Sequence, residues 1–298
     1  MKRILVTGGG SGFLGKTISK YLSKDQQVIT LGRNNSDINI DLALGIPILP
    51  NVDIVIHTAG KAHLNPNSDL DKQEFFNINV NGTKNLLKAL ESSLIPKSFI
   101  FISSVAVYGI ESGEGIDEST PLAACDAYGS SKVKAEQVVS DWCKQNNVIC
   151  TILRLPLIAG PNPPGNLRSM INGIKKGYYF NIAGGRARKS MVLADDVAKI
   201  IPAAGEKGGI YNLTDGYHPS FAELSKKMAQ QLQKKEPANI PMWVAVVMAK
   251  VGDLLGHRSP IDTNKLRKII YNLSFDDSKA RRDIGWRPQR VLDYFKIA

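Results

Sequence analysis

The chain has 298 residues, of which 43% are hydrophobic and 22% are charged. This length and composition exclude a disordered chain, a collagen-like chain and a protein with several membrane spans, and they allow a large buried core. Lysine and arginine exceed the acidic residues by 11, which favours an anionic partner such as a nucleic acid, an anionic membrane surface or a phosphorylated small molecule.

Neither the amino terminus nor the cysteines indicate export. The apolar run 4–6 is too short for the core of a signal peptide. The three cysteines are odd in number and unevenly spaced, and the four histidines lack the spacing of metal ligands. We therefore expect a cytoplasmic protein with neither disulfides nor a bound metal.

Short apolar runs alternate with helical patterns through the first half of the chain. The expected strands are 4–6, 28–31, 54–56, 99–102 and 148–155. The expected helices between them are 13–22, 70–90 and 132–142. Fully apolar strands that alternate with helices predict an α/β fold, a doubly wound parallel sheet of Rossmann type with helices on both faces.

The composition changes at Pro156, where a run of prolines to residue 165 is expected to break any regular element. A strand at 209–214 would return the chain to the sheet, and residues 221–298 look mainly helical. We expect a dinucleotide-binding domain over residues 1–160, rejoined by about 190–215, and a smaller, mainly helical substrate domain over residues 161–298.

A glycine-rich turn, residues 7–15, separates the first strand from the first helix. Glycines at 10, 12 and 15 match the common dinucleotide fingerprint, and those at 9, 12 and 15 match a variant. Glycines let backbone N–H groups approach a pyrophosphate at the positive end of the helix. A tight turn without a ligand is the alternative, but the place in the first strand-to-helix turn favours a nucleotide cofactor.

The residues after the second strand bear on which dinucleotide binds. An acidic residue there usually binds the ribose of NAD, whereas an arginine suits the 2′-phosphate of NADP. This chain has Arg33 and no carboxylate until Asp37. NADP is therefore favoured over NAD, although a solvated surface arginine would give the same sequence.

Three side chains suggest proton transfer. Tyr128 and Lys132 lie four residues apart, on one face of a helix. A nearby ammonium should lower the pKa of a phenol. Ser104 follows the strand 99–102, at the edge of the sheet where ligands bind, and could hold a substrate oxygen while Tyr128 moves its proton. A chance pairing on a helix surface is the alternative.

With these stretches in place, the chain resembles an extended short-chain dehydrogenase/reductase of the NAD-dependent epimerase/dehydratase family, which acts on nucleotide-sugars. The resemblance spans nearly the whole chain. The stretches that carry it are 7–15, 53–60, 79–83, 103–109, 128–132, 189–196 and 274–288.

The resemblance implies that Tyr128 transfers the proton, that Lys132 supports it and touches the nicotinamide ribose, and that Ser104 holds the reacting sugar oxygen. Lys189 and Arg267 are implied as further substrate contacts, to the diphosphate. Beside Tyr128, Lys132 and the Arg33 argued above, the implied cofactor contacts are Gly9, Gly12, Phe13, Leu14, Gly15, Asp41, Leu42, Ala59, Gly60 and Asn79.

Two departures from the family pattern narrow the chemistry. Val105-Ala106 stands where 4,6-dehydratases carry an Asp-Glu pair, which argues against water elimination. The stretch 154–157 lacks the Tyr-Phe-Asn of the best-known galactose epimerases, which argues against UDP-galactose. We expect redox chemistry at C4 of a UDP-hexose or UDP-N-acetylhexosamine, by a 4-epimerase or a 4-keto reductase of cell-surface polysaccharide biosynthesis. Relatives are often homodimers.

Alternative functions stay open at this point. A non-catalytic cofactor sensor would not need Ser104, Tyr128 and Lys132, and a nucleic-acid-binding protein would show a concentrated basic run, which the chain lacks. An enzyme on a polyprenyl-diphosphate-linked sugar is a third alternative. The apolar stretch 240–249 is too short to span a membrane and predicts a helix packed over the cleft, or else a peripheral contact with membrane lipid or a polyprenyl diphosphate.

Overall fold

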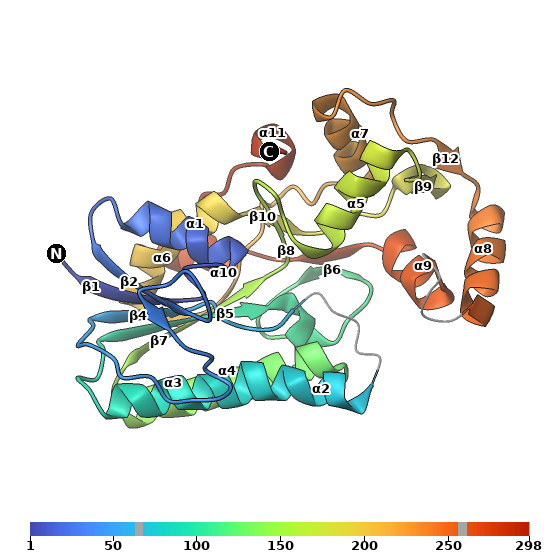
Figure 1. Ribbon diagram of the computed structural model, residues 1–298. Helices are drawn as coiled ribbons and strands as arrows, with labels where there is room; N and C mark the ends of the chain where they lie inside the picture. Colours follow the sequence, from blue (N-terminus) through green and yellow to red (C-terminus); the bar gives the residue numbers. More distant parts are fainter. Residues whose placement is uncertain (63–67, 256–260, 298) are drawn as a thin grey trace.

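The computed structural model describes residues 1–62, 68–255 and 261–297 (Figure 1). Seven parallel strands form its main sheet, in the spatial order β11-β7-β5-β4-β1-β2-β3. This is the strand order of a doubly wound dinucleotide-binding fold. The strands are β1 (Arg3–Thr7), β2 (Gln27–Gly32), β3 (Ile38–Asn39), β4 (Ile54–His57), β5 (Ser98–Ser104), β7 (Ile149–Leu155) and β11 (Gly209–Asn212).

Helices cover both faces of this sheet (Figure 1). One face carries α1 (Phe13–Leu22), α6 (Ala194–Lys207) and α10 (Ser278–Ile284), and the other carries α3 (Gly82–Glu91) and α4 (Ala127–Gln145). Each face has its own apolar core, because the strands are apolar on both sides. The predicted α/β class and doubly wound sheet are confirmed.

The two long predicted helices differ from the sequence expectation in detail. The helix expected over 70–90 is α2 (Asp69–Phe76), the π-helical turn η1 (Asn77–Asn81) and α3 in succession. The helix expected from Lys132 begins at Ala127 instead, because Asp126 caps it: the Asp126 carboxylate accepts a hydrogen bond of 3.0 Å from the backbone N–H of Gly129.

Residues from 156 onward add short strand pairs and further helices beside the sheet. The paired strands are β8 (Leu157–Ala159) with β10 (Met191–Leu193), β9 (Asn181–Ile182) with β12 (Asn239–Ile240), and β6 (Gly113–Ile116) with β13 (Leu273–Phe275). The helices are α5 (Gly165–Lys176), α7 (Phe221–Gln231), α8 (Met242–Leu255), α9 (Thr263–Ile270) and α11 (Val291–Tyr294), with 3-10 turns η2 (Val105–Tyr108) and η3 (Ala183–Gly185).

Two expectations for this part need correction. The prolines do not break every element, because β8 forms between Pro156 and Pro161. Most of the apolar stretch 240–249 forms the helix α8, which begins at Met242 because Ile240 belongs to β12. This helix packs on α9 and lies at the outer edge of the molecule rather than over the main sheet (Figure 1). The domain division at residue 160 stays a prediction.

Candidate active site

The sheet has a switch point between β1 and β4, where ligands of open α/β sheets bind. The strand ends are joined there. The Thr7 hydroxyl lies 2.6 Å from Nδ1 of His57 and accepts a 3.1 Å hydrogen bond from the N–H of Ala59, while Nε2 of His57 lies 2.9 Å from the Thr83 hydroxyl. Burial, with the nearby charge of Lys132, lowers the pKa of His57 to about 3. His57 is therefore a neutral structural link.

The glycine turn is too tight for side chains. Gly8 has a φ of +71°, and its carbonyl oxygen lies only 2.7 Å and 2.3 Å from where a Cβ atom at Gly12 and at Gly15 would be. Helix α1 begins directly after Gly12, and no side chain caps it. The first backbone N–H groups of α1 are therefore free of a side-chain cap and suited to an anion.

The other predicted residues of this turn support its shape. A Cβ at Gly9 would lie 2.7 Å from the Ser19 hydroxyl, so Gly9 packs against α1. Leu14 is buried in the apolar core, and half-buried Phe13 packs against that core. Their backbones belong to the turn, while their side chains hold α1 to the sheet.

Arg33 lies exposed in the loop that follows β2. This loop contacts the glycine turn, because a Cβ at Gly10 would lie 2.0 Å from the carbonyl oxygen of Asn35. Asp37, the nearest carboxylate in sequence, accepts hydrogen bonds of 2.8 Å from the Thr30 N–H and 2.7 Å from the Thr30 hydroxyl, which lower its pKa. Its acceptor oxygen is thus already engaged by β2.

Asp41 and Leu42 follow in a local turn. The Asp41 carboxylate accepts a 2.9 Å hydrogen bond from the N–H of Ala43, and the Leu42 carbonyl accepts one of 2.8 Å from the side chain of Asn85 in α3. Leu42 is buried in the core beneath α3. The pair therefore lies along the same edge of the sheet as the glycine turn, held there by α3.

Asn79 is buried in the π-helical turn η1, a type of irregularity that is frequent at functional sites. The side-chain Oδ1 of Asn79 accepts a hydrogen bond from the backbone N–H of Lys61 (2.7 Å). The side-chain Nδ2 donates to the backbone carbonyl of Lys61 (3.1 Å) and to the Ser131 hydroxyl (2.8 Å). A Cβ at Gly60 would lie 3.0 Å from Asn79 Oδ1 and 3.4 Å from Lys132 Nζ. The segment after β4 is thereby fixed against α4.

Ser104 ends β5, and Tyr128 lies in the first turn of α4. The Ser104 side chain lies near enough to the Tyr128 phenol to lower its pKa by hydrogen bonding to the phenolate form. The Tyr128 ring also lies 6.1 Å from the ring of Phe75 in α2. The structure thus joins two residues that are far apart in sequence, as the catalytic prediction requires.

The expected fall in the pKa of Tyr128 is wrong for the protein without ligands. Burial raises this pKa, the hydrogen bond from Ser104 opposes the rise, and the charge of Asp126 adds to it. The reason is that the phenol sits in a low-dielectric pocket, where the charged phenolate is disfavoured.

The ammonium of Lys132 is buried and held against β5. Its Nζ donates a 2.8 Å hydrogen bond to the carbonyl of Ile102 and lies 4.6 Å from the centre of the Phe101 ring. Burial lowers the pKa of Lys132 to about 8, and the charge of Glu136 partly offsets this effect. Lys132 therefore stays mostly protonated at neutral pH but titrates far closer to it than an exposed lysine does, and a bound anionic ligand would further favour its protonated form.

A buried ion pair lies next to this set. The Arg154 guanidinium donates to both carboxylate oxygens of Glu136, at 3.1 Å and 2.7 Å, and to the Tyr108 hydroxyl at 3.1 Å. Ser103, the neighbour of Ser104, donates to the same carboxylate. Tyr128, Lys132 and Glu136 follow at intervals of four residues along α4, so one helix face joins the proton-transfer residues to this pair.

The two predicted substrate cations lie beside β13. The backbone of half-buried Lys189 forms an isolated parallel β-bridge with Leu273. Burial lowers the pKa of the Lys189 ammonium to about 8. The charge of Glu111 opposes this change and the charge of Lys268 adds to it. Arg267 lies exposed on α9. The α9 cation whose charge acts on Lys189 is therefore Lys268, the neighbour of the predicted Arg267.

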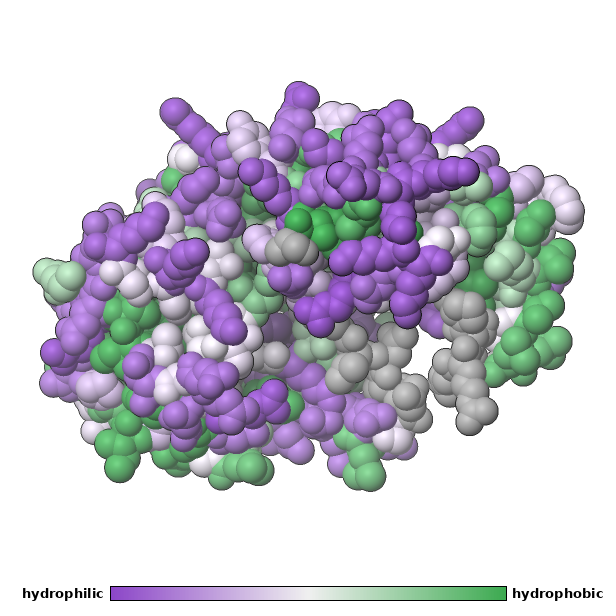
Figure 2. Space-filling view, turned by 45° about the horizontal axis from the view of Figure 1, so that its top comes forward, coloured by the Kyte–Doolittle hydropathy of each residue, from purple (hydrophilic) through white to green (hydrophobic). Residues whose placement is uncertain are grey.

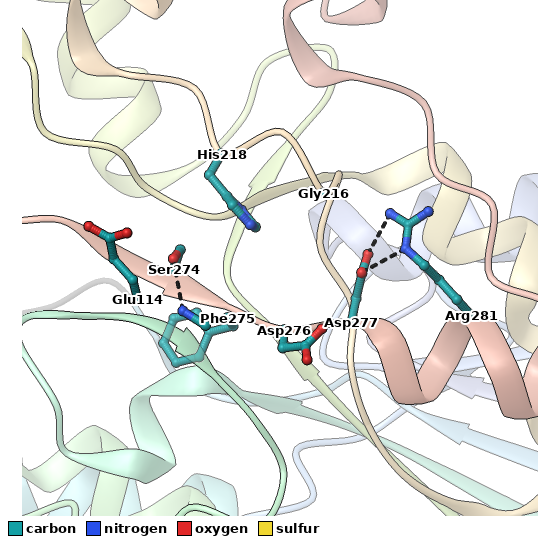
Figure 3. Close-up of a pocket in the computed structure, with 9 residues that line it drawn as sticks. Glu114, Gly216, His218, Ser274, Phe275, Asp276, Asp277 and Arg281 are labelled. Atoms are coloured by element: carbon teal, nitrogen blue, oxygen red, sulfur yellow. Dashed lines mark hydrogen bonds and ion pairs between the residues drawn. The ribbon is translucent and has the colours of Figure 1, made fainter.

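An open depression of about 510 Å³ lies elsewhere, between β6, β13 and α10 (Figure 3). Its lining includes none of the predicted site residues. Arg281 points at Asp277 on one side of it, with hydrogen bonds of 2.7 Å and 3.0 Å. Asp277 also accepts from the indole of buried Trp286 (3.1 Å). These contacts give the closing stretch 274–288 a structural role.

Among the described residues, no three His, Cys, Asp or Glu side chains gather to hold a metal.

Three partners of the site were missed in the sequence. Ser131 orients Asn79, Phe101 supports the ammonium of Lys132, and Ile102 accepts its hydrogen bond. The position of Ser131 between Tyr128 and Lys132 is a signal that sequence reasoning could have used. The other two contacts depend on the pairing of α4 with β5, which no local pattern encodes.

The strand order, the glycine turn and the Ser104, Tyr128 and Lys132 set define a short-chain dehydrogenase/reductase of Rossmann type. Comparisons with known proteins agree. The model of the NAD dependent epimerase/dehydratase family matches residues 4–214. Because this is more than half of the chain, the protein belongs to that family. It is accordingly an enzyme of an NAD-dependent family.

Several relatives share this fold along nearly their full length. UDP-glucose 4-epimerase of Vibrio cholerae is 27% identical, over 98% of this chain and 92% of its own. N-acetyl-alpha-D-glucosaminyl-diphospho-ditrans,octacis-undecaprenol 4-epimerase of Escherichia coli O157:H7 is also 27% identical, over 91% and 87%. The structure of RMD from Pseudomonas aeruginosa, complexed with NADPH, has a TM-score of 0.74 at 22% identity, over 98% and 95%.

Proposed function

We propose that this enzyme carries out NAD(P)-dependent redox chemistry at C4 of a nucleotide-activated sugar, a UDP-hexose or UDP-N-acetylhexosamine. The observation that carries the proposal is the approach of the Ser104 side chain to Tyr128, with the buried ammonium of Lys132 on the same helix as Tyr128. The relative from Vibrio cholerae, a UDP-glucose 4-epimerase, supports the substrate class. A cytoplasmic location, a homodimer and a role in polysaccharide biosynthesis stay predictions.

The residues at the switch point fit a dinucleotide. The uncapped N–H groups of α1 suit a pyrophosphate, and the tight approach of Gly12 and Gly15 to Gly8 leaves the turn without side chains that would block one. Asn79 and Lys132 bound the part of the cleft next to Gly60. When bound there, the nicotinamide would supply the acceptor or donor of a hydride.

The protein's own part is to position the sugar and move a proton. Ser104 would hold the C4 oxygen by a hydrogen bond, and Tyr128 would take or return the proton of the C4 hydroxyl. Lys132, protonated when an anionic cofactor is bound, would lower the pKa of Tyr128 from the raised value that burial causes. Val105 and Ala106 bring no acid or base, so these residues support redox chemistry without water elimination.

The test separates the two outcomes of this chemistry. Purified protein is incubated with UDP-glucose or UDP-N-acetylglucosamine and with each oxidised cofactor, and the configuration at C4 is followed by proton NMR. An epimerase equilibrates the two C4 configurations with no net change in reduced nicotinamide. A parallel incubation of a 4-keto nucleotide-sugar with each reduced cofactor tests for a reductase, which would consume the reduced cofactor. The absence of both changes, with all of these sugars, would contradict the proposal.

A second candidate substrate is a sugar linked to a polyprenyl diphosphate. The relative from Escherichia coli O157:H7 carries such a substrate in its name, and the apolar outer face of α8 described below would suit work near a membrane. Presenting the same sugar as the nucleotide and as the polyprenyl diphosphate in detergent would decide between them. A higher kcat/KM for the lipid-linked form would favour the second candidate.

Arg33 is expected to make the enzyme bind NADP(H) at least as well as NAD(H). A guanidinium can grip a 2′-phosphate with two hydrogen bonds, and such charge-assisted contacts are worth about 1.5–3 kcal/mol, or roughly 10- to 150-fold in affinity. The Asp37 oxygen that could oppose this phosphate already binds Thr30. Calorimetric titration of both cofactors should show that Arg33→Ala reduces the difference in affinity between NADP(H) and NAD(H). A clear preference for NAD that Arg33→Ala leaves unchanged would rule Arg33 out as the phosphate contact.

Lys189 is expected to make substrate binding depend on pH. Its pKa is about 8 in the free protein, and only the protonated ammonium attracts a diphosphate. Affinity should therefore be full below pH 8 and fall as the pH rises above it. Calorimetry with UDP at pH 7 and pH 9 measures this fall. In Lys189→Arg the guanidinium stays charged at both values, so the fall should shrink; an equal fall in this variant would assign the pH effect to another group.

A further inference from the structure

Helix α8 turns its small apolar residues inward and its large apolar residues outward, the opposite of the usual arrangement. The residues that it buries are its smallest, Ala245, Ala249 and Gly252. The side chains that it exposes include Trp243, which is 71% exposed, and Leu254, which is 88% exposed. A helix that served the core of this protein would bury its large apolar residues.

The exposed residues form one continuous stripe. Trp243, Val247, Val251 and Leu254 recur at the spacing of a single helix face, with Met248 and Leu255 beside them. Figure 2 shows apolar residues gathered along the outer edge of the molecule that α8 forms in Figure 1. A gathering of this kind on a soluble surface marks an interaction site.

The inner face of α8 is fixed to the rest of the chain. Ala245 and Ala249 pack in a small core with Leu266 of α9 and Ile182 of β9. The carboxylate of Asp253 accepts hydrogen bonds from the N–H and the hydroxyl of Thr263, at the start of α9. The outward stripe is therefore presented by an anchored helix.

The charge of the protein is concentrated in the same part of the chain. Residues 161–298 contain 23 of the 38 lysines and arginines and 12 of the 27 acids, whereas residues 1–160 contain 15 of each sign. The whole excess of +11 thus belongs to the part that carries α8. Lys250 on α8 and Arg267 on α9 are exposed. An apolar stripe with exposed cations on α8 and on its neighbour α9, in the basic part of the chain, complements an anionic lipid surface.

We propose that the outer face of α8 docks the enzyme on an anionic phospholipid bilayer, with α8 lying in the plane of the interface. Trp243 is suited to the headgroup level, because an indole is apolar in its body and polar at its N–H. The contact is peripheral: α8 has 14 residues, and no helix in the described parts of the chain is long and apolar enough to cross a bilayer.

Docking by α8 also bears on the proposed substrate site. Lys268 of α9, the helix on which α8 packs, is the cation whose charge acts on Lys189. Docking would hold α9, which packs on the inner face of α8, directly behind the docked helix. The inference itself does not rest on the proposed chemistry, because vesicle binding is measured without cofactor or sugar.

The test is sedimentation of the full chain with vesicles of phosphatidylcholine alone or mixed with phosphatidylglycerol. We expect binding to the mixed vesicles at low salt and a loss of about tenfold or more in Trp243→Ser/Val247→Ser/Leu254→Ser. The matched control is Leu44→Ser/Ile48→Ser, which removes apolar side chains that are 87% and 96% exposed in the loop before β4. This control should bind like the parent, and both variants should keep the parent's melting temperature because the replaced residues are exposed.

Tryptophan fluorescence gives a second measurement. The chain has three tryptophans, and Trp142 and Trp286 are buried, so a blue shift on adding vesicles reports Trp243. Binding without a blue shift, or equal loss in the control, would overturn docking by α8. Coverage of this face by a second copy of the chain would also overturn it. That case would show no binding to vesicles, together with a dimer in analytical ultracentrifugation that only the triple variant dissociates.

Discussion

Tyr128→Phe is expected to lower turnover by about 10²–10⁴-fold, the range typical of a lost general acid–base group. The variant removes only the hydroxyl, the group whose pKa Ser104 lowers. The ring would keep its place beside Phe75 and the start of α4, so cofactor binding should change little. Steady-state kinetics with the substrate from the NMR assay, together with calorimetry of cofactor binding, measure both effects.

Tyr108→Phe is the matched control for this variant. Tyr108 is a buried tyrosine in the turn η2 after β5, and its hydroxyl donates to Asn212 at 2.8 Å and accepts from Arg154. Its loss should reduce stability by about 0.5–1.5 kcal/mol while turnover stays within a few-fold. If both variants lost activity alike, or if Tyr128→Phe stayed within a few-fold of the parent, Tyr128 would not be the proton-transfer residue.

The central strands of the main sheet could be predicted because each is an apolar run that is mostly buried, whereas the two-residue edge strand β3 was missed. The runs at 4–6, 54–56 and 99–102 became β1, β4 and β5 with small changes at their ends. Short strands such as β9 and β12 were missed because two residues carry no periodicity of their own. Their pairing depends on a neighbour that is distant in sequence.

The site shows the same division between local pattern and tertiary contact. The spacing of Tyr128 and Lys132 is local, and it correctly placed both on α4. The sign of the pKa shift of Tyr128 was wrong because burial decides it, and burial follows from the packing of α2 and η1 against α4. Arg267 was chosen for its charge, whereas the pairing of β13 brings its neighbour Lys268 into the field of Lys189.

The partnership of Glu136 and Arg154 could not be predicted from either residue alone. Arg154 lies on β7 opposite Ser103 of β5, and Glu136 lies on the inner face of α4. Both side chains are almost fully buried, at 4% and 5% exposed. Only the stacking of α4 on these two central strands brings a carboxylate and a guanidinium together.

Removing one member of this pair is expected to cause the largest loss of stability of any single change discussed. Arg154→Leu would leave the Glu136 carboxylate buried and uncompensated, since its remaining partner is the Ser103 hydroxyl. Breaking a buried ion pair in this way typically costs about 3–5 kcal/mol. Equilibrium unfolding in urea, followed by circular dichroism, measures the loss of unfolding free energy.

The double variant Glu136→Leu/Arg154→Leu decides whether the loss comes from the unpaired charge. Replacing a whole buried pair by apolar residues is often nearly neutral, because the cost of desolvating both charges disappears with their attraction. The double variant should therefore be more stable than Arg154→Leu, although the hydroxyls of Ser103 and Tyr108 lose partners in it. Additive losses would instead assign the effect to packing around β7. A loss below about 1 kcal/mol in Arg154→Leu would mean that water reaches the carboxylate and that the pair is not a buried one in solution.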